Sequence, residues 1–162
     1  MRVTPLPAWS YVATKATASM LVILPVLVLV DVVGVAFGGV DLSAGTWFAL
    51  TALLWVTALP FALLGVFIGF VATAETAFPV VTGLMFVLGY FGGLFNPVSG
   101  MPSVLRATAR ILPSFHHAAL GLALLDGHGF GIEHWLVLAG YVLVLSLAIV
   151  WKHRVEEMRG LA

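Results

Sequence analysis

Residues 89–121 read GYFGGLFNPVSGMPSVLRATARILPSFHHAALG, and this stretch decides how the rest of the chain is arranged. An apolar helix ends within it near Pro97, and Pro102 follows soon after. A short, half-polar helical piece is expected over residues 103–112, since proline interrupts a helix on either side of it. A second turn at Pro113 leads into a third piece. The pattern predicts a chain that reaches the membrane surface, lies along it in broken helices, and then crosses back.

The composition indicates that lipid is the solvent of this chain. Of its 162 residues, 62% are hydrophobic and 9% are charged, and the mean hydropathy is +1.14. Soluble domains carry about 25% charged residues, and a small domain leaves much of its surface exposed. Seven basic and seven acidic side chains cancel, so no nucleic-acid partner is expected. Cysteine is absent, which excludes disulfides and thiolate metal sites.

Four apolar runs are long enough to cross a bilayer, which requires about 20 apolar residues in a helix. We expect the crossings at about residues 16–37, 46–71, 79–95 and 135–151, with interfacial helices at about residues 103–125. Pro79 is expected to open the third crossing, since proline favours the first helical turn. The sequence therefore predicts an all-α integral membrane protein, one transmembrane domain with a broken re-entrant or interfacial helical segment before its last crossing.

Four crossings leave both ends of the chain on one side of the membrane. Basic residues concentrate on the cytoplasmic side of membrane proteins. The side of the two termini carries five of them, and the other side carries two: Arg2, Lys15, Lys152, Arg154 and Arg159 against Arg106 and Arg110. The bias predicts a multi-pass protein of the cell membrane with both termini cytoplasmic.

Asp31 is the ionisable residue well inside the first apolar run. Ionisable residues within a membrane span often line a pathway or pair across helices. Alternatively, the carboxylate reaches the interface because the helix ends near Gly34. Both interpretations stay open, and the interfacial one is favoured.

Small residues recur at four-residue spacing, which lets membrane helices approach closely and often marks a packing or dimer face. Because glycine is frequent in membrane helices, chance explains such pairs as well as an interface does. The pairs are Gly34 and Gly38, Gly65 and Gly69, and Gly89 and Gly93.

Histidines gather on the predicted outer side together with two acidic residues. As zinc ligands they would need convergent geometry, but their spacing does not match a metal-binding motif such as H-E-x-x-H. Side chains facing headgroups and water are the favoured interpretation, and no cofactor is expected. The residues are His116, His117, His128, His134, Asp126 and Glu133.

Arg106 and Arg110 lie four residues apart in the half-polar piece, so they share one face of a helix. A helix that lies on a lipid surface needs such a polar face opposite an apolar one. The spacing therefore predicts an interfacial helix rather than a plain loop.

The order of these features resembles the later part of the membrane subunit of a type-2 ABC transporter, the ABC-2 permease family. The opening TPLPAWSYVATK, residues 4–15, is similar to the cytoplasmic connector before that family's third helix. Residues 92–121 are similar to the end of its fifth helix and to its re-entrant outer helices. The matching residues of this stretch are Phe95, Pro97, Met101, Pro102, Leu112, Pro113 and His116.

The resemblance implies an exporter subunit without chemistry of its own, which pairs with a second permease subunit and with separate ATP-binding-cassette ATPase subunits. Neither Lys15 nor Lys152 follows a glycine-rich loop, so no phosphate-binding loop is present and ATP hydrolysis is expected from a partner chain. By resemblance, the ATPase would contact Pro5, Leu6, Pro7, Trp9 and Glu75. The outer re-entrant segment would contain Pro97, Pro102, Arg106, Arg110, Pro113 and His116, and would close the outer mouth.

The family normally has six crossings, and this chain starts where the third would begin. A fragment, a split gene product or a remnant is therefore expected. Two other function classes stay open, namely an accessory scaffolding membrane protein and a membrane metalloenzyme that uses the outer histidines. Members of the family export drugs, lipids, polysaccharides and other glycoconjugates, and no residue here selects among them.

Overall fold

The computed structural model describes residues 8–93, 95 and 100–160 of the chain. In these ranges every regular element is an α-helix, which confirms the predicted all-α class. The helices are α1 (Ala8–Phe37), α2 (Ala44–Thr57), α3 (Leu59–Val71), α4 (Ala74–Phe91), α5 (Ser103–Ala109), α6 (Pro113–Leu125) and α7 (Ile132–Gly160).

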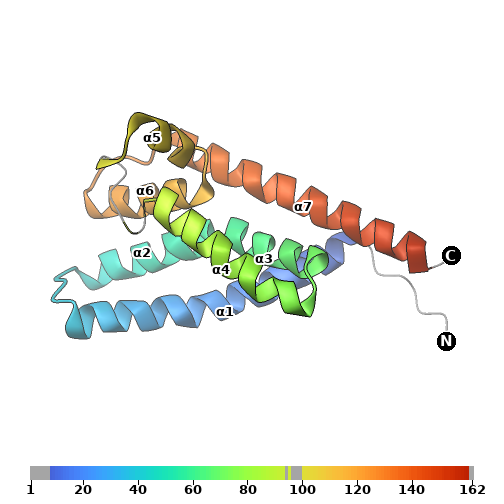
Figure 1. Cartoon of the computed structure of the whole chain (residues 1–162). Coiled ribbons are helices and arrows are strands. Elements are labelled where there is room, and N and C mark those ends of the chain that lie inside the picture. The colour runs from blue at the N-terminus through green and yellow to red at the C-terminus, as the bar shows by residue number, and fades with distance from the viewer. Residues whose placement is uncertain (1–7, 94, 96–99, 161–162) are drawn as a thin grey trace.

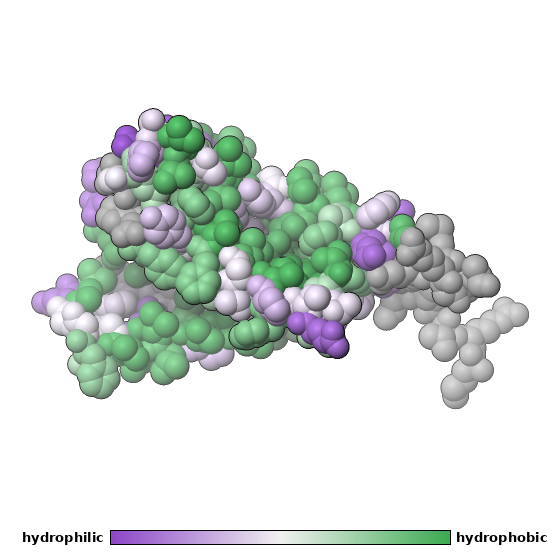
Figure 2. Space-filling model, in the orientation of Figure 1, coloured by the Kyte–Doolittle hydropathy of each residue, from purple (hydrophilic) through white to green (hydrophobic). Residues whose placement is uncertain are grey.

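Four stretches of these helices are long and apolar enough to cross a membrane: Trp9–Phe37, Ala44–Val71, Ala74–Phe91 and Ile132–Val155. Figure 2 shows hydrophobic residues along most of the bundle and hydrophilic ones mainly near its two ends. Many valine and leucine side chains of α1 are exposed, among them Val22 at 67% and Leu29 at 62%. Such a surface is typical of helices that face lipid or another membrane helix.

The second crossing consists of two helices, α2 and α3, that meet at Ala58. Pro60 lies in the first turn of α3. Because proline has no amide hydrogen, it cannot close the helical hydrogen bond to the carbonyl four residues earlier. The amide of Ala58 instead donates to the Trp55 carbonyl at 3.1 Å, which tightens the last turn of α2.

The prediction that Pro79 opens the third crossing is wrong, because α4 already begins at Ala74 and Pro79 lies inside it. Thr73 starts the helix. Its hydroxyl accepts from the amide of Thr76 at 3.3 Å, and the hydroxyl of Thr76 accepts from the amide of Thr73 at 3.0 Å. This capping box satisfies backbone amides that would otherwise lack partners. The helix ends at Phe91, earlier than the expected residue 95, and Gly93 then takes a φ of 83°.

The core lies where α1, α3 and α7 pack together. Its centre consists of Val12, Ala16, Leu63 and Ile149. The first turn of α1 and the last turns of α7 lie at the same end of the bundle, which we call the terminal end (Figure 1). Ring contacts join them there, because Tyr11 lies 5.0 Å from the His153 ring and 5.2 Å from the Phe70 ring.

The two short helices α5 and α6 lie at the opposite end, beside α2, α4 and α7 (Figure 1). Gly121 of α6 packs against α2, since a Cβ there would lie 3.3 Å from Leu54. The hydroxyl of Tyr141 on α7 donates to the carbonyl of Ile111 at 3.1 Å. The predicted broken helical segment before the last crossing is therefore confirmed, and it is held by helices on several sides.

Candidate functional site

The candidate site is the re-entrant segment, which we define as residues 101–125 and which comprises α5, α6 and the turn between them. Pro102 is the N-cap of α5, Arg110 is its C-cap, and Pro113 lies in the first turn of α6. The prolines therefore set where both helices begin. Pro97, predicted for the same segment, lies outside the described residues.

Arg106 and Arg110 are both exposed, as the expected interfacial helix requires. The Nη2 atom of Arg106 donates to the carbonyl of Met101 at 3.1 Å, which closes the entry to α5. Val104 is 74% exposed and Ile111 is 67% exposed on the same piece of chain. Exposed apolar and basic side chains together suit a helix at a lipid surface, and its place in the membrane stays a prediction.

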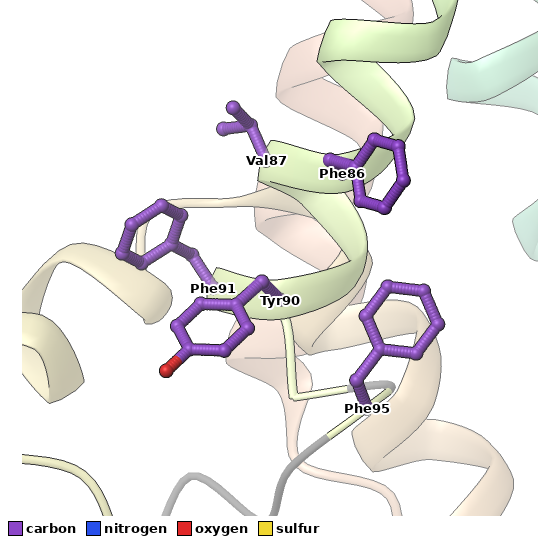
Figure 3. Close-up of a pocket in the computed structure, with 5 residues that line it drawn as sticks. All are labelled: Phe86, Val87, Tyr90, Phe91 and Phe95. Atoms are coloured by element: carbon purple, nitrogen blue, oxygen red, sulfur yellow. The ribbon is translucent and has the colours of Figure 1, made fainter.

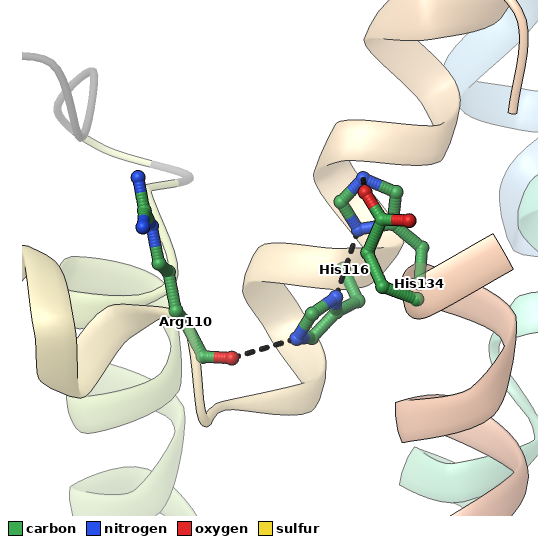
Figure 4. Close-up of polar contacts among 4 residues, drawn as sticks. Arg110, His116 and His134 are labelled. Atoms are coloured by element: carbon green, nitrogen blue, oxygen red, sulfur yellow. Dashed lines mark hydrogen bonds and ion pairs between the residues drawn. The ribbon is translucent and has the colours of Figure 1, made fainter. Parts of the chain in front are cut away.

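His116 is a buried polar side chain of the segment and is only 4% exposed. Its Nε2 atom lies 2.7 Å from the carbonyl oxygen of Arg110, and its Nδ1 atom lies 2.8 Å from Nδ1 of His134 on α7 (Figure 4). The ring therefore joins the end of α5, α6 and the first turn of α7.

The hydrogen-bond partners determine the tautomers of both rings. A carbonyl oxygen only accepts, so Nε2 of His116 must carry the hydrogen. Nδ1 of neutral His116 is then an acceptor, and Nδ1 of His134 must donate to it. Burial is the largest influence and lowers the pKa of His116, whereas the bond to the Arg110 carbonyl raises it. The charge of His134 also lowers this pKa, and the charge of Glu133 raises it. The neutral ring is thus the favoured form.

His117 faces away from this pair, toward α2. Its Nδ1 atom lies 2.7 Å from the hydroxyl of Thr57, and that hydroxyl donates to the carbonyl of Leu53 at 2.8 Å. The single hydrogen of the hydroxyl is used in that bond, so toward His117 the hydroxyl acts as the acceptor. The Nδ1 atom of His117 must therefore carry a hydrogen. Burial lowers the pKa of His117, and its bond to Thr57 opposes the shift.

The predicted histidine cluster therefore divides. His116 and His134 bond to each other, His117 bonds to Thr57, and His128 lies exposed in the loop before α7. Glu133 lies 3.8 Å from Nε2 of His134. Within the described ranges, no group of three or more potential ligands is placed to hold a metal ion. The side chains do not converge on one point as zinc would require.

Two apolar hollows adjoin the segment where α4 ends. One, of about 520 Å³, is lined by Phe86, Val87, Tyr90, Phe91 and Phe95 (Figure 3). The other, of about 700 Å³, shares Phe86 and Phe95 and reaches Phe61 and Ser114. The Oγ atom of Ser114 is buried without a hydrogen-bond partner and packs against Gly92, where a Cβ would overlap it. The hollows offer mainly apolar contact.

Asp31 lies half-buried on α1 and accepts a hydrogen bond from the hydroxyl of Thr51 on α2. The same hydroxyl lies 2.9 Å from the carbonyl of Trp47. Next to this contact the Trp47 ring covers Gly34, where a Cβ would lie 3.0 Å from the ring. Gly34 thus serves packing within the chain. A role of Asp31 in a pathway stays a prediction.

The residues predicted to contact an ATPase are only partly described. Trp9 is 68% exposed in the first turn of α1, and Glu75 is exposed in the first turn of α4. Both first turns lie at the terminal end (Figure 1). Pro5, Leu6 and Pro7 lie outside the described residues.

Sequence reasoning missed the polar partners of these side chains. Thr57, Thr51 and the Arg110 carbonyl carry no motif, and threonine is common in apolar helices. The sequence offered one signal for these contacts, which is the position of Thr57 near the middle of the apolar run that Pro60 interrupts. A threonine at such a place can form a hydrogen bond to a facing helix.

Comparison with known proteins identifies the family. The family model described as ABC-2 type transporter matches residues 1–122. The chain is 26% identical over 159 residues to a protein of Bacillus subtilis (strain 168) named "Putative transport permease YvfS", and the match covers 97% of this chain and 64% of that protein. The chain thus spans less than two thirds of the length of this relative. No solved structure matches the chain.

The family model covers well over half of the chain, including the crossing helices α1 to α4 and the re-entrant segment up to Leu122. The chain therefore belongs to the ABC-2 type transporter family.

Proposed function

We propose that this chain is a transmembrane permease subunit of an ATP-binding-cassette exporter, coupled to a separate ATPase subunit and paired with a second permease subunit. The observation that carries the proposal is the re-entrant segment packed between crossing helices in a chain of the ABC-2 family. Such a chain supplies part of a path through the membrane, while ATP hydrolysis comes from its partner. The cell membrane is the proposed location, with both termini cytoplasmic.

The proposed ATPase contact lies at the terminal end. Trp9 is a large aromatic side chain that is 68% exposed, and aromatic residues are enriched at the energetically important centres of protein interfaces. Glu75 offers a charge in the first turn of α4, where the helix dipole stabilises it. Motion received at these two turns would pass along α1 and α4 because each is one continuous helix.

The proposed closure of the path lies at the opposite end. The re-entrant segment contacts α2, α4 and α7. A shift of any of these helices would therefore move it. The apolar hollows beside Phe86 and Phe95 would then offer contact to an apolar part of a transported molecule.

The test is purification of the tagged chain from membranes of its own organism in mild detergent, followed by identification of the proteins that accompany it. We expect an ATP-binding-cassette ATPase in stoichiometric amount. Trp9→Ala combined with Glu75→Gln should reduce its recovery severalfold, because both substitutions remove exposed groups at the terminal end. Phe130→Ala is the matched control, since Phe130 is 45% exposed in the loop at the opposite end.

A chain recovered without any ATPase would contradict the proposal. Loss of the ATPase in the Phe130→Ala control would show that the proposed contact surface is wrong. A complex that hydrolyses ATP at a rate insensitive to every candidate substrate would instead favour a scaffolding subunit.

A further inference from the structure

The ring of His116 joins three helices through two hydrogen bonds. Nε2 donates to the carbonyl of Arg110 at the end of α5, and Nδ1 accepts from His134 on α7. With the ring 4% exposed, water cannot readily replace either bond. Together with the bond from Tyr141 to the Ile111 carbonyl, this ring supplies the polar attachment of the re-entrant segment to α7.

One added proton would leave the bond between the two rings in place. With three ring hydrogens on the pair, one lies between the two Nδ1 atoms and each Nε2 atom carries one, whichever ring bears the charge. A second added proton would place a hydrogen on both Nδ1 atoms, which lie 2.8 Å apart. Two N–H groups would then face each other with no acceptor between them, and the rings would separate.

The first added proton has a place on the far side of His134. Nε2 of His134 lies 3.8 Å from the carboxylate of Glu133, so a hydrogen there faces a group of opposite charge. The contact between the rings therefore survives one added proton and is broken by two.

The surroundings of His116 hold few other charges. His134 and Glu133 face it from α7, and Arg110 precedes it with an exposed guanidinium group. His117 of the same helix turns toward Thr57 of α2. In the described part of the chain, no hydrogen bond or ion pair joins His116 to α2 or α4. The contact with α7 is therefore the one that protonation of both rings would disturb.

We propose that the contact between His116 and His134 is a pH-operated latch between the re-entrant segment and α7, which is closed while at most one of the two rings is protonated and opens when both rings carry a proton. Burial favours the neutral ring, so the latch stays closed near neutral pH and opens in more acidic surroundings. That the latch would regulate transport rests on the proposed function, whereas the latch itself does not.

The experiment measures the distance between α5 and α7 as a function of pH. The chain has no cysteine, so Val104→Cys on α5 and Leu147→Cys on α7 give two specific positions for spin labels. Both native side chains are exposed, at 74% and 61%. The full chain is placed in lipid nanodiscs, and the distance distribution is recorded by electron paramagnetic resonance from about pH 8 to about pH 4.5, a range that spans the ordinary pKa of histidine.

We expect one narrow distribution at neutral pH and a broader, longer one at acidic pH, with a midpoint below about 6.5. His116→Gln should remove the change, because an amide does not titrate in this range. His134→Gln should also remove it, since the amide can rotate and offer its oxygen to protonated His116. His128→Gln is the matched control and should behave like the unsubstituted chain, because His128 is exposed in a loop.

A distribution that stays constant across the whole range in the unsubstituted chain would overturn the latch. A pH response that persists in His116→Gln or His134→Gln would do so as well. If His116→Gln does not fold, His134→Gln and the unsubstituted chain still decide the question. The measurement needs no ATPase, so its outcome is independent of the co-purification test.

Discussion

At the scale of single residues, this protein places its buried polar groups where two helices meet. Thr57 bonds to His117, Thr51 to Asp31, and His116 to His134. In lipid, an unpaired polar group costs about several kcal/mol. Each of these bonds therefore specifies which helix face packs against which, in addition to contributing stability.

Thr57→Val should destabilise the protein by about 1–3 kcal/mol, because it leaves the Nδ1 hydrogen of His117 buried without an acceptor. The double substitution Thr57→Val with His117→Phe should recover much of this loss, since both polar partners are then absent. Thermal unfolding in detergent measures the effect. Equal destabilisation by the single and double variants would show that the hydrogen bond is not the cause.

Stability should fall as the medium becomes acidic. The pKa values of His116 and His117 are lower in the folded chain than the ordinary value of 6.5, mainly because of burial. Below that value the unfolded chain binds more protons than the folded one, so the free energy of unfolding decreases as pH falls. The contribution of these two histidines to the free energy of unfolding is fully present above about pH 6.5, and it is lost as pH falls through their lowered pKa values.

The midpoint of thermal unfolding, measured at several pH values, should drop by at least a few degrees below about pH 6.5. The double variant His116→Gln with His117→Gln should show a flatter profile, whatever its overall stability. A midpoint that rises on acidification would contradict the sign of this linkage.

At the scale of helices, the end of α4 depends on a close approach that only glycine allows. Gly92 follows the last residue of α4, and a Cβ there would overlap both Ser114 of α6 and the carbonyl of Leu88. The glycine therefore lets the re-entrant segment fold back directly onto the helix from which it emerges. Prolines in the sequence predict that the chain breaks here, but not how close the pieces come.

Gly92→Ala should destabilise the protein by about 1–3 kcal/mol, the range typical of overpacking. Gly83→Ala is the matched control within α4, because no atom lies within 4 Å of a Cβ at that position. The control should be neutral or stabilising by about 0.5–1 kcal/mol, since alanine favours a helix over glycine. Equal effects of the two substitutions on thermal unfolding would contradict the proposed contact.

The start of α4 illustrates why element boundaries could be predicted only in part. Proline favours first turns, so Pro79 was expected there. The structure begins the helix at Ala74 because Thr73 and Thr76 form a capping box. Two threonines can form this box or bond elsewhere, and the sequence does not distinguish these outcomes. By contrast, the apolar runs themselves predicted all four stretches able to cross a membrane.

At the scale of the whole molecule, the two ends of the bundle differ in character. The terminal end gathers the start of α1, the last turns of α7 and the turn before α4, whereas the opposite end holds α5 and α6 (Figure 1). The core between α1, α3 and α7 lies toward the terminal end. Helix α4 has less extensive contacts with the rest of the bundle than the other crossing helices have. This suits an element that moves or receives a partner.

The two ends should lie on opposite sides of the membrane. Single cysteines introduced by Glu75→Cys and His128→Cys, in a chain without native cysteine, report on each end. In intact cells, a thiol reagent that does not cross membranes should label position 128 and leave position 75 unlabelled until the cells are opened. Labelling of position 75 alone would place the termini outside the cell, against the bias of basic residues.

The sequence by itself determined that helices of this chain cross a bilayer and that a broken segment precedes the last of them. The physical reason is local: in lipid each backbone amide must bond within its own helix, and Pro102 and Pro113 stand where α5 and α6 begin. Only the tertiary structure decided which side chains meet, such as His116 with His134 and His117 with Thr57. Those contacts depend on the rotation and register of packed helices, which arise from side-chain packing between segments far apart in the chain.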